Sequence, residues 1–123
     1  MSFFKTKQKT TIKQPALIPE GMKVVGNINC NGDIKIDGIL EGNIICSGKI
    51  IISKSAKVKG NINAVTAILQ GFLKGKINCS HLLSIDDHAS LQGDVYYKNI
   101  KMSNGAELVG ELFKLNEDQL KKP

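Results

Sequence analysis

The sequence contains no tryptophan and no arginine, and aromatic residues make up only 5% of its 123 residues. A domain with one compact core usually fills it with large aromatic side chains, so their scarcity indicates a narrow core built from small aliphatic residues. Arginine is the side chain that most often reads guanine edges and binds phosphate through two parallel hydrogen bonds. Its absence argues against nucleic acid as the partner, although the net charge is +6. Binding of an acidic polymer by lysine alone stays open.

Histidine and cysteine are also few, with two and three residues respectively. The cysteines lack the short Cys-x₂₋₄-Cys spacing of zinc sites, and a three-histidine zinc site cannot be built from His81 and His88 alone. Asp86 and Asp87, which precede His88, are interpreted as an exposed turn between strands. We therefore expect no catalytic residue, no bound metal and no cofactor.

No apolar run is long enough to span a bilayer, and the N-terminus does not resemble a secretion signal. An odd number of cysteines without an export signal is typical of a cytoplasmic protein. The charge is uneven along the chain: residues 1–23 contain five lysines and one glutamate, a net charge of +4, whereas the remaining residues add only +2. The basic charge therefore lies mainly in the N-terminal segment.

The dominant feature of the sequence is a repeated phrase of the form aliphatic, any, Gly, any, aliphatic. Its six copies are Val24-Val25-Gly26-Asn27-Ile28, Leu40-Glu41-Gly42-Asn43-Ile44, Val58-Lys59-Gly60-Asn61-Ile62, Leu73-Lys74-Gly75-Lys76-Ile77, Leu91-Gln92-Gly93-Asp94-Val95 and Leu108-Val109-Gly110-Glu111-Leu112. The glycines are 16, 18, 15, 18 and 17 residues apart. Self-similarity at a nearly fixed period is the signature of a repeat architecture.

The alternation within each copy predicts strands with one buried face. Aliphatic residues lie two positions before and after each glycine, whereas the adjacent positions are mostly polar. The position four after the glycine holds Cys30, Cys46 and Cys79, so the cysteines are predicted to form one inward-facing column. A second and a third apolar pair complete each period, giving three short strands per turn. One coil cannot bury its own inner face, so the coils must stack.

We therefore predict an all-β fold, a three-sided β-helix of about six coils that occupies residues 20–114. Coils stacked at roughly 4.8 Å give a rod on the order of 30 Å long. Residues 1–19 are predicted to be a disordered or extended basic tail, because they are rich in Lys, Thr and Gln and include two prolines. Residues 115–123 form a short polar tail, in which Asn116–Lys122 has the only helical pattern.

Two runs resemble the core of the bactofilin family. They are Ile36-Asp37-Gly38-Ile39-Leu40-Glu41-Gly42-Asn43-Ile44 and Ser47-Gly48-Lys49-Ile50-Ile51-Ile52-Ser53-Lys54-Ser55-Ala56-Lys57-Val58-Lys59-Gly60-Asn61-Ile62. The resemblance covers about residues 18–112 and departs from the family pattern at Val65-Thr66-Ala67. It implies a right-handed β-helix that polymerises without nucleotide, through head-to-head and tail-to-tail contacts, into non-polar filaments. It further implies a bacterial cytoskeletal scaffold for cell-shape or cell-wall proteins, peripheral on the inner face of the cytoplasmic membrane.

The two open ends of the solenoid are the predicted polymer interface. An uncapped end exposes unpaired backbone groups above an apolar cross-section, which invites pairing with another chain. No strong polar cap is apparent at either end of the repeat. The candidate interface residues are Val24, Val25 and Ile28 at one end and Leu108, Leu112 and Phe113 at the other.

The N-terminal segment is the predicted membrane contact. Apolar side chains next to lysines combine insertion with attraction to anionic lipid, at about 1 kcal/mol per lysine near the surface. The residues are Met1, Phe3, Phe4, Lys5, Lys7 and Lys9. An ordinary solubilising tail is the alternative interpretation.

A left-handed hexapeptide-repeat acyltransferase-like trimer is the rival fold and function. It requires a strict six-residue period, which the glycine spacings do not follow. One catalytic histidine at a trimer seam stays open as an alternative, as does a filament that binds acidic polymers.

Overall fold

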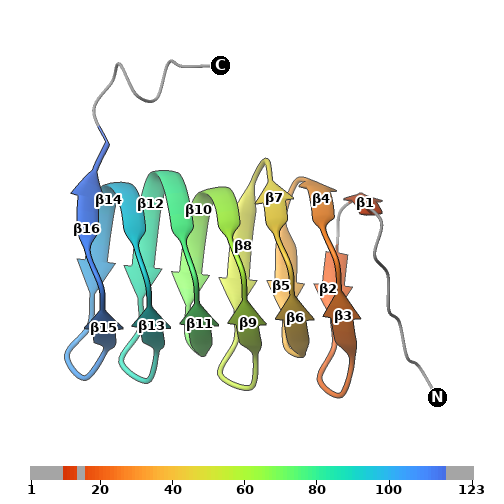
Figure 1. Ribbon diagram of the computed structural model, residues 1–123, viewed down its shortest axis with the longest axis horizontal. Helices are drawn as coiled ribbons and strands as arrows, with labels where there is room; N and C mark the ends of the chain where they lie inside the picture. The colour runs from red at the N-terminus through yellow and green to blue at the C-terminus, as the bar shows by residue number, and fades with distance from the viewer. Residues whose placement is uncertain (1–9, 14–15, 116–123) are drawn as a thin grey trace.

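The computed structural model describes residues 10–13 and 16–115, in which the chain forms sixteen β-strands and no helix (Figure 1). The strands form the three faces of a solenoid. The first face contains β1 (Thr10–Lys13), β4 (Ile28–Asn31), β7 (Ile44–Cys46), the first part of β10 (Ile62–Leu69), β12 (Ile77–Ile85) and β14 (Val95–Met102), and β16 (Leu112–Lys114). The second face contains β2 (Ala16–Ile18), β5 (Ile34–Ile36), β8 (Lys49–Ile52) and the later parts of β10, β12 and β14. The third face contains β3 (Lys23–Val25), β6 (Ile39–Glu41), β9 (Lys57–Lys59), β11 (Phe72–Lys74), β13 (Ser90–Gln92) and β15 (Glu107–Val109).

Every strand pairs in parallel with the equivalent strand of an adjacent coil. Leu40 lies beside Val58 on the third face, Ile44 beside Ile62 on the first, and Ile34 beside Ile50 on the second. Six coils run from β1–β3 to β14–β15, and β16 begins a further one. The predicted all-β solenoid of about six coils is confirmed.

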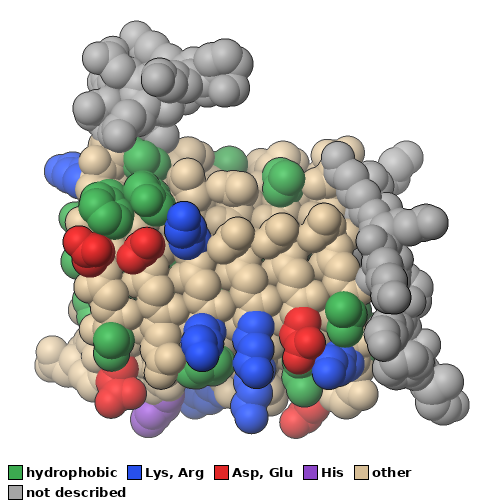
Figure 2. Space-filling view, viewed as in Figure 1, with side chains coloured by type: hydrophobic (Ala, Val, Ile, Leu, Met, Phe, Trp, Pro, Cys, Tyr) green, Lys and Arg blue, Asp and Glu red, His purple; other side chains and the backbone are tan. Residues whose placement is uncertain are grey.

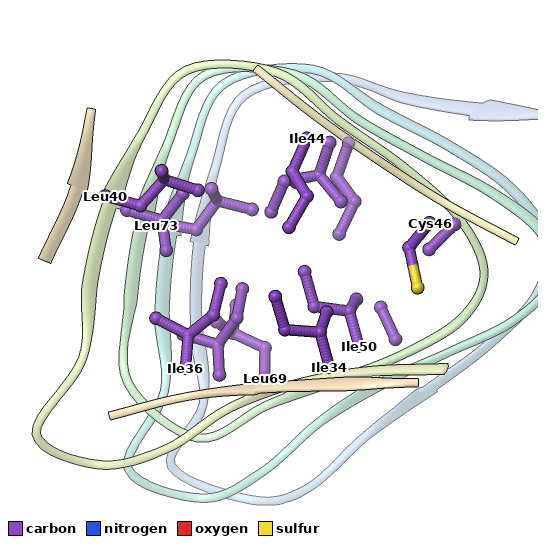
Figure 3. Close-up of a cluster of buried hydrophobic side chains, with 14 of the residues drawn as sticks. Ile34, Ile36, Leu40, Ile44, Cys46, Ile50, Leu69 and Leu73 are labelled. Carbon is purple, nitrogen blue, oxygen red and sulfur yellow. The ribbon is translucent and has the colours of Figure 1, made fainter. Parts of the chain in front are cut away.

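The core is a single cluster of buried side chains, mostly aliphatic, that extends from Ala16 to Val95. Figure 3 shows part of it, with side chains pointing into the interior of the solenoid. Leu40, Ile44 and Ile50 project inward from the three faces of their coils, and each is completely buried. No polar or charged residue is buried among residues 16–115. Each fully buried Ile or Leu side chain contributes about 1.5–3 kcal/mol to the hydrophobic stabilisation. The inward positions are those predicted from the alternation around each glycine.

The glycines of the repeated phrase form a column at the corner between the third and first faces. They have left-handed backbone angles, with φ of +142° at Gly60 and +148° at Gly42. A Cβ atom on Gly60 would overlap the carbonyl oxygen of Gly42 in the preceding coil. Because neither the angle nor the space admits a side chain, the corner requires glycine.

The first coil begins earlier in the chain than the sequence indicated. The strands β1 and β2 lie within the region predicted to be a disordered tail, and Ile18 is only 3% exposed. Pro15 lies outside the described residues. Pro19 does not interrupt a ladder: it follows β2 directly, and its carbonyl accepts a hydrogen bond from the Met22 N–H at 3.1 Å, which closes the turn into β3. Pro at the end of a strand costs no ladder hydrogen bond. The predicted helical segment 116–122 lies outside the described residues.

The irregular stretch noted around Val65 is where one strand turns a corner. The register of β10 with β12 shifts between Ala64 and Thr66, and β12 shifts against β14 between Cys79 and Leu82. Such bulges bend a strand. Because of them, β10 and β12 each cover both the first and the second face.

Candidate assembly surface

The C-terminal end of the rod exposes the apolar cross-section of the solenoid. Leu112 of β16 is in the same column as Val95, and Met102 of β14 is in the same column as Ile85. Val95 and Ile85 are fully buried, whereas Leu112 is 45% and Met102 is 44% exposed. The side chains are of the same kind and face the same interior. They differ in exposure because no further coil of the described chain covers the last one.

The same end also presents open strand edges. Within the rod, backbone N–H groups donate to the neighbouring coil, as Val95 N–H does to the Glu111 carbonyl at 2.8 Å. In the part of the chain that the structure describes, no strand lies beyond β15 on the third face or β16 on the first. Within the described residues the outer edges of these strands have no strand partner, and open edges of this kind favour pairing with another chain.

The N-terminal end differs in where its predicted interface residues lie. The outermost layer there is β1–β3, so Ile28 of β4 lies one layer further in, beside Thr10 of β1. Val24 and Ile28 are 3% and 2% exposed, and Val25 is half-buried. The sequence interpretation placed Ile28 at the end because it took the Gly26 phrase as the first coil. At this end Leu17 is 57% exposed, on the outside of β2.

Comparison with protein families decides what kind of protein this solenoid is. The family model for bactofilin, described as polymer-forming cytoskeletal, matches residues 16–112. The chain belongs to the bactofilin family. Comparison with curated proteins found no match, and neither did comparison with solved structures. The bactofilin match begins at the first residue of β2, which agrees with the early start of the solenoid. Because that family is a structural cytoskeletal one, the C-terminal end of this bactofilin is the main candidate for assembly.

Phe113 of this bactofilin lies on the outside of the rod. It is 39% exposed, and its ring stacks on that of Tyr96 in the preceding coil, with centroids 4.9 Å apart and an angle of 17° between the planes. Its side chain therefore belongs to the rim of the C-terminal end, whereas Leu112 belongs to the cross-section. Its role in a polymer contact stays a prediction.

Met102 is an end residue that the sequence interpretation missed. It lies in the second apolar pair of the last coil, and its partner Ile85 is completely buried. Its position could have been predicted from the sequence, because Met102 occupies the same place in its apolar pair as Ile85 does in the pair of the preceding coil. Leu108, which was predicted, lies in register with Leu91 and is partly exposed.

The three cysteines of the bactofilin lie in the core. All three are buried as free thiols, and Cys30 lies in register with Cys46. Burial raises the pKa of the Cys79 thiol to about 12, and burial together with the neighbouring Cys46 raises the pKa of Cys30 to about 11. Thiols with raised pKa values are poor nucleophiles and poor metal ligands at neutral pH. The structure thus places the cysteines as the sequence predicted, in an inward-facing column.

The remaining predicted groups do not converge on a site. His81 and His88 are exposed, on β12 and in the turn that follows it. Residues 10–13 and 16–115 include no group of three side chains that could hold a metal ion. No helix in these ranges is long and apolar enough to cross a membrane. The predicted lipid-contact residues Met1 to Lys9 lie outside the described residues.

Proposed function

We propose that this bactofilin self-assembles end to end into filaments without nucleotide. The observation that carries the proposal is the exposed apolar cross-section at the C-terminal end, where Leu112 and Met102 are each nearly half exposed. Stacking a second end on these side chains would bury them as completely as Val95 and Ile85 are buried one coil earlier. Apolar burial and strand-edge pairing are equilibrium processes, so assembly by this route needs no nucleotide hydrolysis.

A charge placed in the cross-section tests the contact. Leu112→Arg should convert filaments into short soluble species, because an unpaired charge would be buried in each contact. Val109→Arg is the matched control, since Val109 of the preceding strand β15 is 66% exposed on the outside of the rod. Negative-stain microscopy and sedimentation of purified protein without nucleotide are the measurements. Filaments of normal length for Leu112→Arg would contradict the proposed interface.

Phe113→Arg is a separate test of the rim. The substitution removes the stacking with Tyr96 and adds a charge beside the cross-section. Under the proposal it shortens filaments, because the rim must also dehydrate when two ends meet. Unaltered filaments would remove Phe113 from the interface and leave Leu112 in it.

We further propose that the filament is non-polar, with C-terminal ends meeting each other. This part rests on the family resemblance. A cysteine introduced by Val109→Cys should cross-link to the same residue of a second copy through a short bis-maleimide, whereas a polar filament would give no such dimer. The native cysteines are buried, with raised pKa values, and should not react. Cross-linking that requires Val25→Cys as the second site would indicate a polar filament instead.

The filament is proposed to act as a scaffold for cell-shape or cell-wall proteins on the inner face of the membrane. Attachment is assigned to Phe3 and Phe4 with the neighbouring lysines. Binding by one such segment is weak, and repetition along a filament strengthens it. Co-sedimentation with anionic vesicles should be lost on deletion of residues 1–9 and on the milder Phe3→Ser/Phe4→Ser change. Retained binding by both variants would overturn this assignment.

A further inference from the structure

The first face differs from the third in the kind of side chain at its outward positions. The third face has charged residues there, such as Glu41, Lys59 and Lys74, which lie in register. From β4 to the first part of β12, the first face has uncharged ones: Asn29, Asn31, Ile45, Asn63, Asn78 and Ser80. Figure 2 shows the first face in the upper part of the view, mostly tan, with a few charged side chains near its C-terminal end.

Five of the outward residues follow one another in register from coil to coil. We name them the asparagine column: Asn29, Ile45, Asn63, Asn78 and Tyr96. Asparagine is depleted in strands. Asn63 and Asn78 are exposed, and neither side chain forms a hydrogen bond with another residue among residues 16–115. The stability of the fold therefore gives no reason for these amides.

A second row of amides lies beside the asparagine column, at the corner before each strand. The Oδ1 atoms of Asn27, Asn43 and Asn61 each accept a hydrogen bond from a backbone N–H of the following coil. These bonds hold each amide in one orientation, and each amide also has two N–H donors on Nδ2. Donors that are held in place before a ligand arrives lose less entropy when it binds.

The surface of the first face is hollowed where the two rows of amides meet. One hollow has a volume of about 200 Å³ and includes Asn27, Asn29, Asn43 and Ile45 in its lining. A neighbouring hollow of about 370 Å³ shares Asn29 and Ile45 with it. Ile45 is 53% exposed, so both hollows combine amides with an aliphatic surface. Their volumes lie below or near the lower end of the range for drug-sized ligands, about 300–1,000 Å³. Hollows of this size suit single units of a longer ligand.

A further hollow, of about 190 Å³, lies closer to the C-terminal end. Its lining includes Asn61, Asn63, Lys76, Asn78 and Tyr96. The ring of Phe113 covers one face of the Tyr96 ring, so the other face is turned towards the preceding coil, in which Asn78 lies. The electron-rich face of an aromatic ring attracts polarised C–H groups. Amides bind hydroxyl groups well, because each group both donates and accepts hydrogen bonds. An aromatic ring beside several amides is therefore suited to a sugar ring.

We propose that the asparagine column binds an extended, uncharged glycan that lies along the rod, with one sugar unit per coil. The coils repeat at about 4.8 Å, which is close to the length of one sugar unit in an extended β-1,4-linked chain. An extended peptide along the rod would present like-facing side chains every 6.6 Å or so, about twice the rise per residue, and would lose register with the coils. A nucleic acid or an anionic glycan requires a cationic surface, which the first face does not offer from β4 to the first part of β12. The inference is independent of the proposed filament, because the column lies on the side of a single rod.

Titration of the full-length protein with neutral hexasaccharides tests the site. Cellohexaose is an extended β-1,4-linked chain, whereas the α-1,4 linkages of maltohexaose make its chain curve. Cellohexaose should bind about tenfold more tightly or better, because only an extended chain meets several coils at once. Saturation-transfer NMR and titration calorimetry are the measurements.

Removal of two amides from the column tests which residues bind. Asn63→Ala/Asn78→Ala should weaken cellohexaose binding about tenfold, because two amide–hydroxyl hydrogen bonds are lost. Asn63→Val/Asn78→Val should weaken it as much, and its higher strand propensity protects the fold. Circular dichroism verifies that both variants are folded. The matched control is Gln92→Ala/Asn104→Ala, which removes two exposed amides from the third face and from the turn after β14. It should bind cellohexaose as the unaltered protein does.

The dependence on salt distinguishes amide contacts from charge contacts. Affinity for cellohexaose should be the same at low salt and at about 1 M salt, because no pair of charges is involved. A steep loss of affinity with salt would assign the contact to lysines and overturn the inference. Absence of binding to either hexasaccharide, equal binding of both, or unchanged binding by the folded Asn63 and Asn78 variants would also overturn it. A face that serves a protein partner would give the first of these three results. The proposed filament stands under all of them.

Discussion

At the scale of single residues, the glycine column sets how closely the coils approach. Gly60 combines a φ of +142° with a space already occupied by the Gly42 carbonyl, whereas Gly21 has a φ of +89° and no atom within 4 Å of an added Cβ. Substitutions at these two glycines therefore distinguish the cost of backbone strain alone from the cost of strain combined with steric overlap.

Gly60→Ala should lower the free energy of unfolding by more than about 3 kcal/mol, since it combines strain with an overlap against backbone. Gly21→Ala should cost only about 1 kcal/mol, from strain alone. Urea denaturation followed by circular dichroism measures both. Equal losses would show that steric overlap contributes nothing at the corner.

Cys79 should make the fold sensitive to alkaline pH. Its thiol has a pKa of about 12 in the folded chain against 9.0 in the unfolded chain, because burial disfavours the thiolate. The unfolded chain therefore loses this proton first as the pH rises. The stability that it contributes is complete below pH 9 and is lost progressively towards pH 12.

The test compares the unaltered protein with Cys79→Val by denaturation at several pH values from 7 to about 11. The variant should lose less stability than the unaltered protein above pH 9. Cys30 provides a second raised pKa, so some alkaline loss persists in the variant. Parallel curves for the two proteins would contradict the assignment.

The inward residues were predictable from the sequence because the spacing around each glycine repeats with a period of two. The parity that places Cys79 inside also places Phe113, three residues after its glycine, outside. Phe113 was assigned to the end surface because it is hydrophobic, and that assignment did not use the alternation of inward and outward positions. How far Leu112 and Met102 are exposed depends on whether another coil follows, which local sequence does not specify.

At the scale of elements, asparagine side chains tie successive coils together at the same corner. The Asn27 Oδ1 atom accepts from the Asn43 N–H at 3.3 Å, Asn43 from the Asn61 N–H at 3.2 Å, and Asn61 from the Lys76 N–H at 3.3 Å. These N–H groups lie between strands, outside the regular ladder. The sequence interpretation recognised Gly42-Asn43 as a corner signal, but hydrogen bonds between coils could be identified only once the register was known.

Asn43→Ala should lower the free energy of unfolding by about 0.5–1.5 kcal/mol, because the Asn61 N–H loses its acceptor. Asn63→Ala is the control, since Asn63 is exposed on the first face and its side chain forms no hydrogen bond within the described residues. It should change stability by less than about 0.5 kcal/mol. Equal effects would mean that the asparagine bonds between coils contribute nothing.

The strands β1 and β2 were missed because composition was given more weight than alternation. Ala16-Leu17-Ile18 has the same inward, outward, inward order as the later strands, and Ala16 and Ile18 are buried while Leu17 is exposed. A three-residue alternation between prolines is too short a signal to outweigh a lysine-rich context. The parallel pairing of β2 with β5 stabilises a strand that the short local pattern alone does not predict.

At the scale of the whole molecule, stability should vary along the rod. Each coil contacts mainly its neighbours, so the solenoid behaves as a nearly one-dimensional array. A central strand such as β9 has a partner on both sides, whereas β15 and β16 have a described partner on one side only. The last coil is therefore the first to open.

Hydrogen exchange measures this difference. In unassembled Leu112→Arg protein, amides of β15 should exchange about tenfold faster than those of β9, or more. In filaments of the unaltered protein the amides of β15 should become protected, because the open edge gains a partner. Uniform exchange along the rod would contradict a one-dimensional array.

The in-register glycine column has a consequence for how such a protein can change over generations. Because Gly42 and Gly75 occupy equivalent corners two coils apart, excising residues 43–75 joins one corner to another and shortens the rod by roughly 10 Å. The chemistry of both ends is untouched. Duplication or loss of coils would therefore change the length of the subunit without changing the residues at its ends. The axial repeat of an end-to-end assembly would change by the same length.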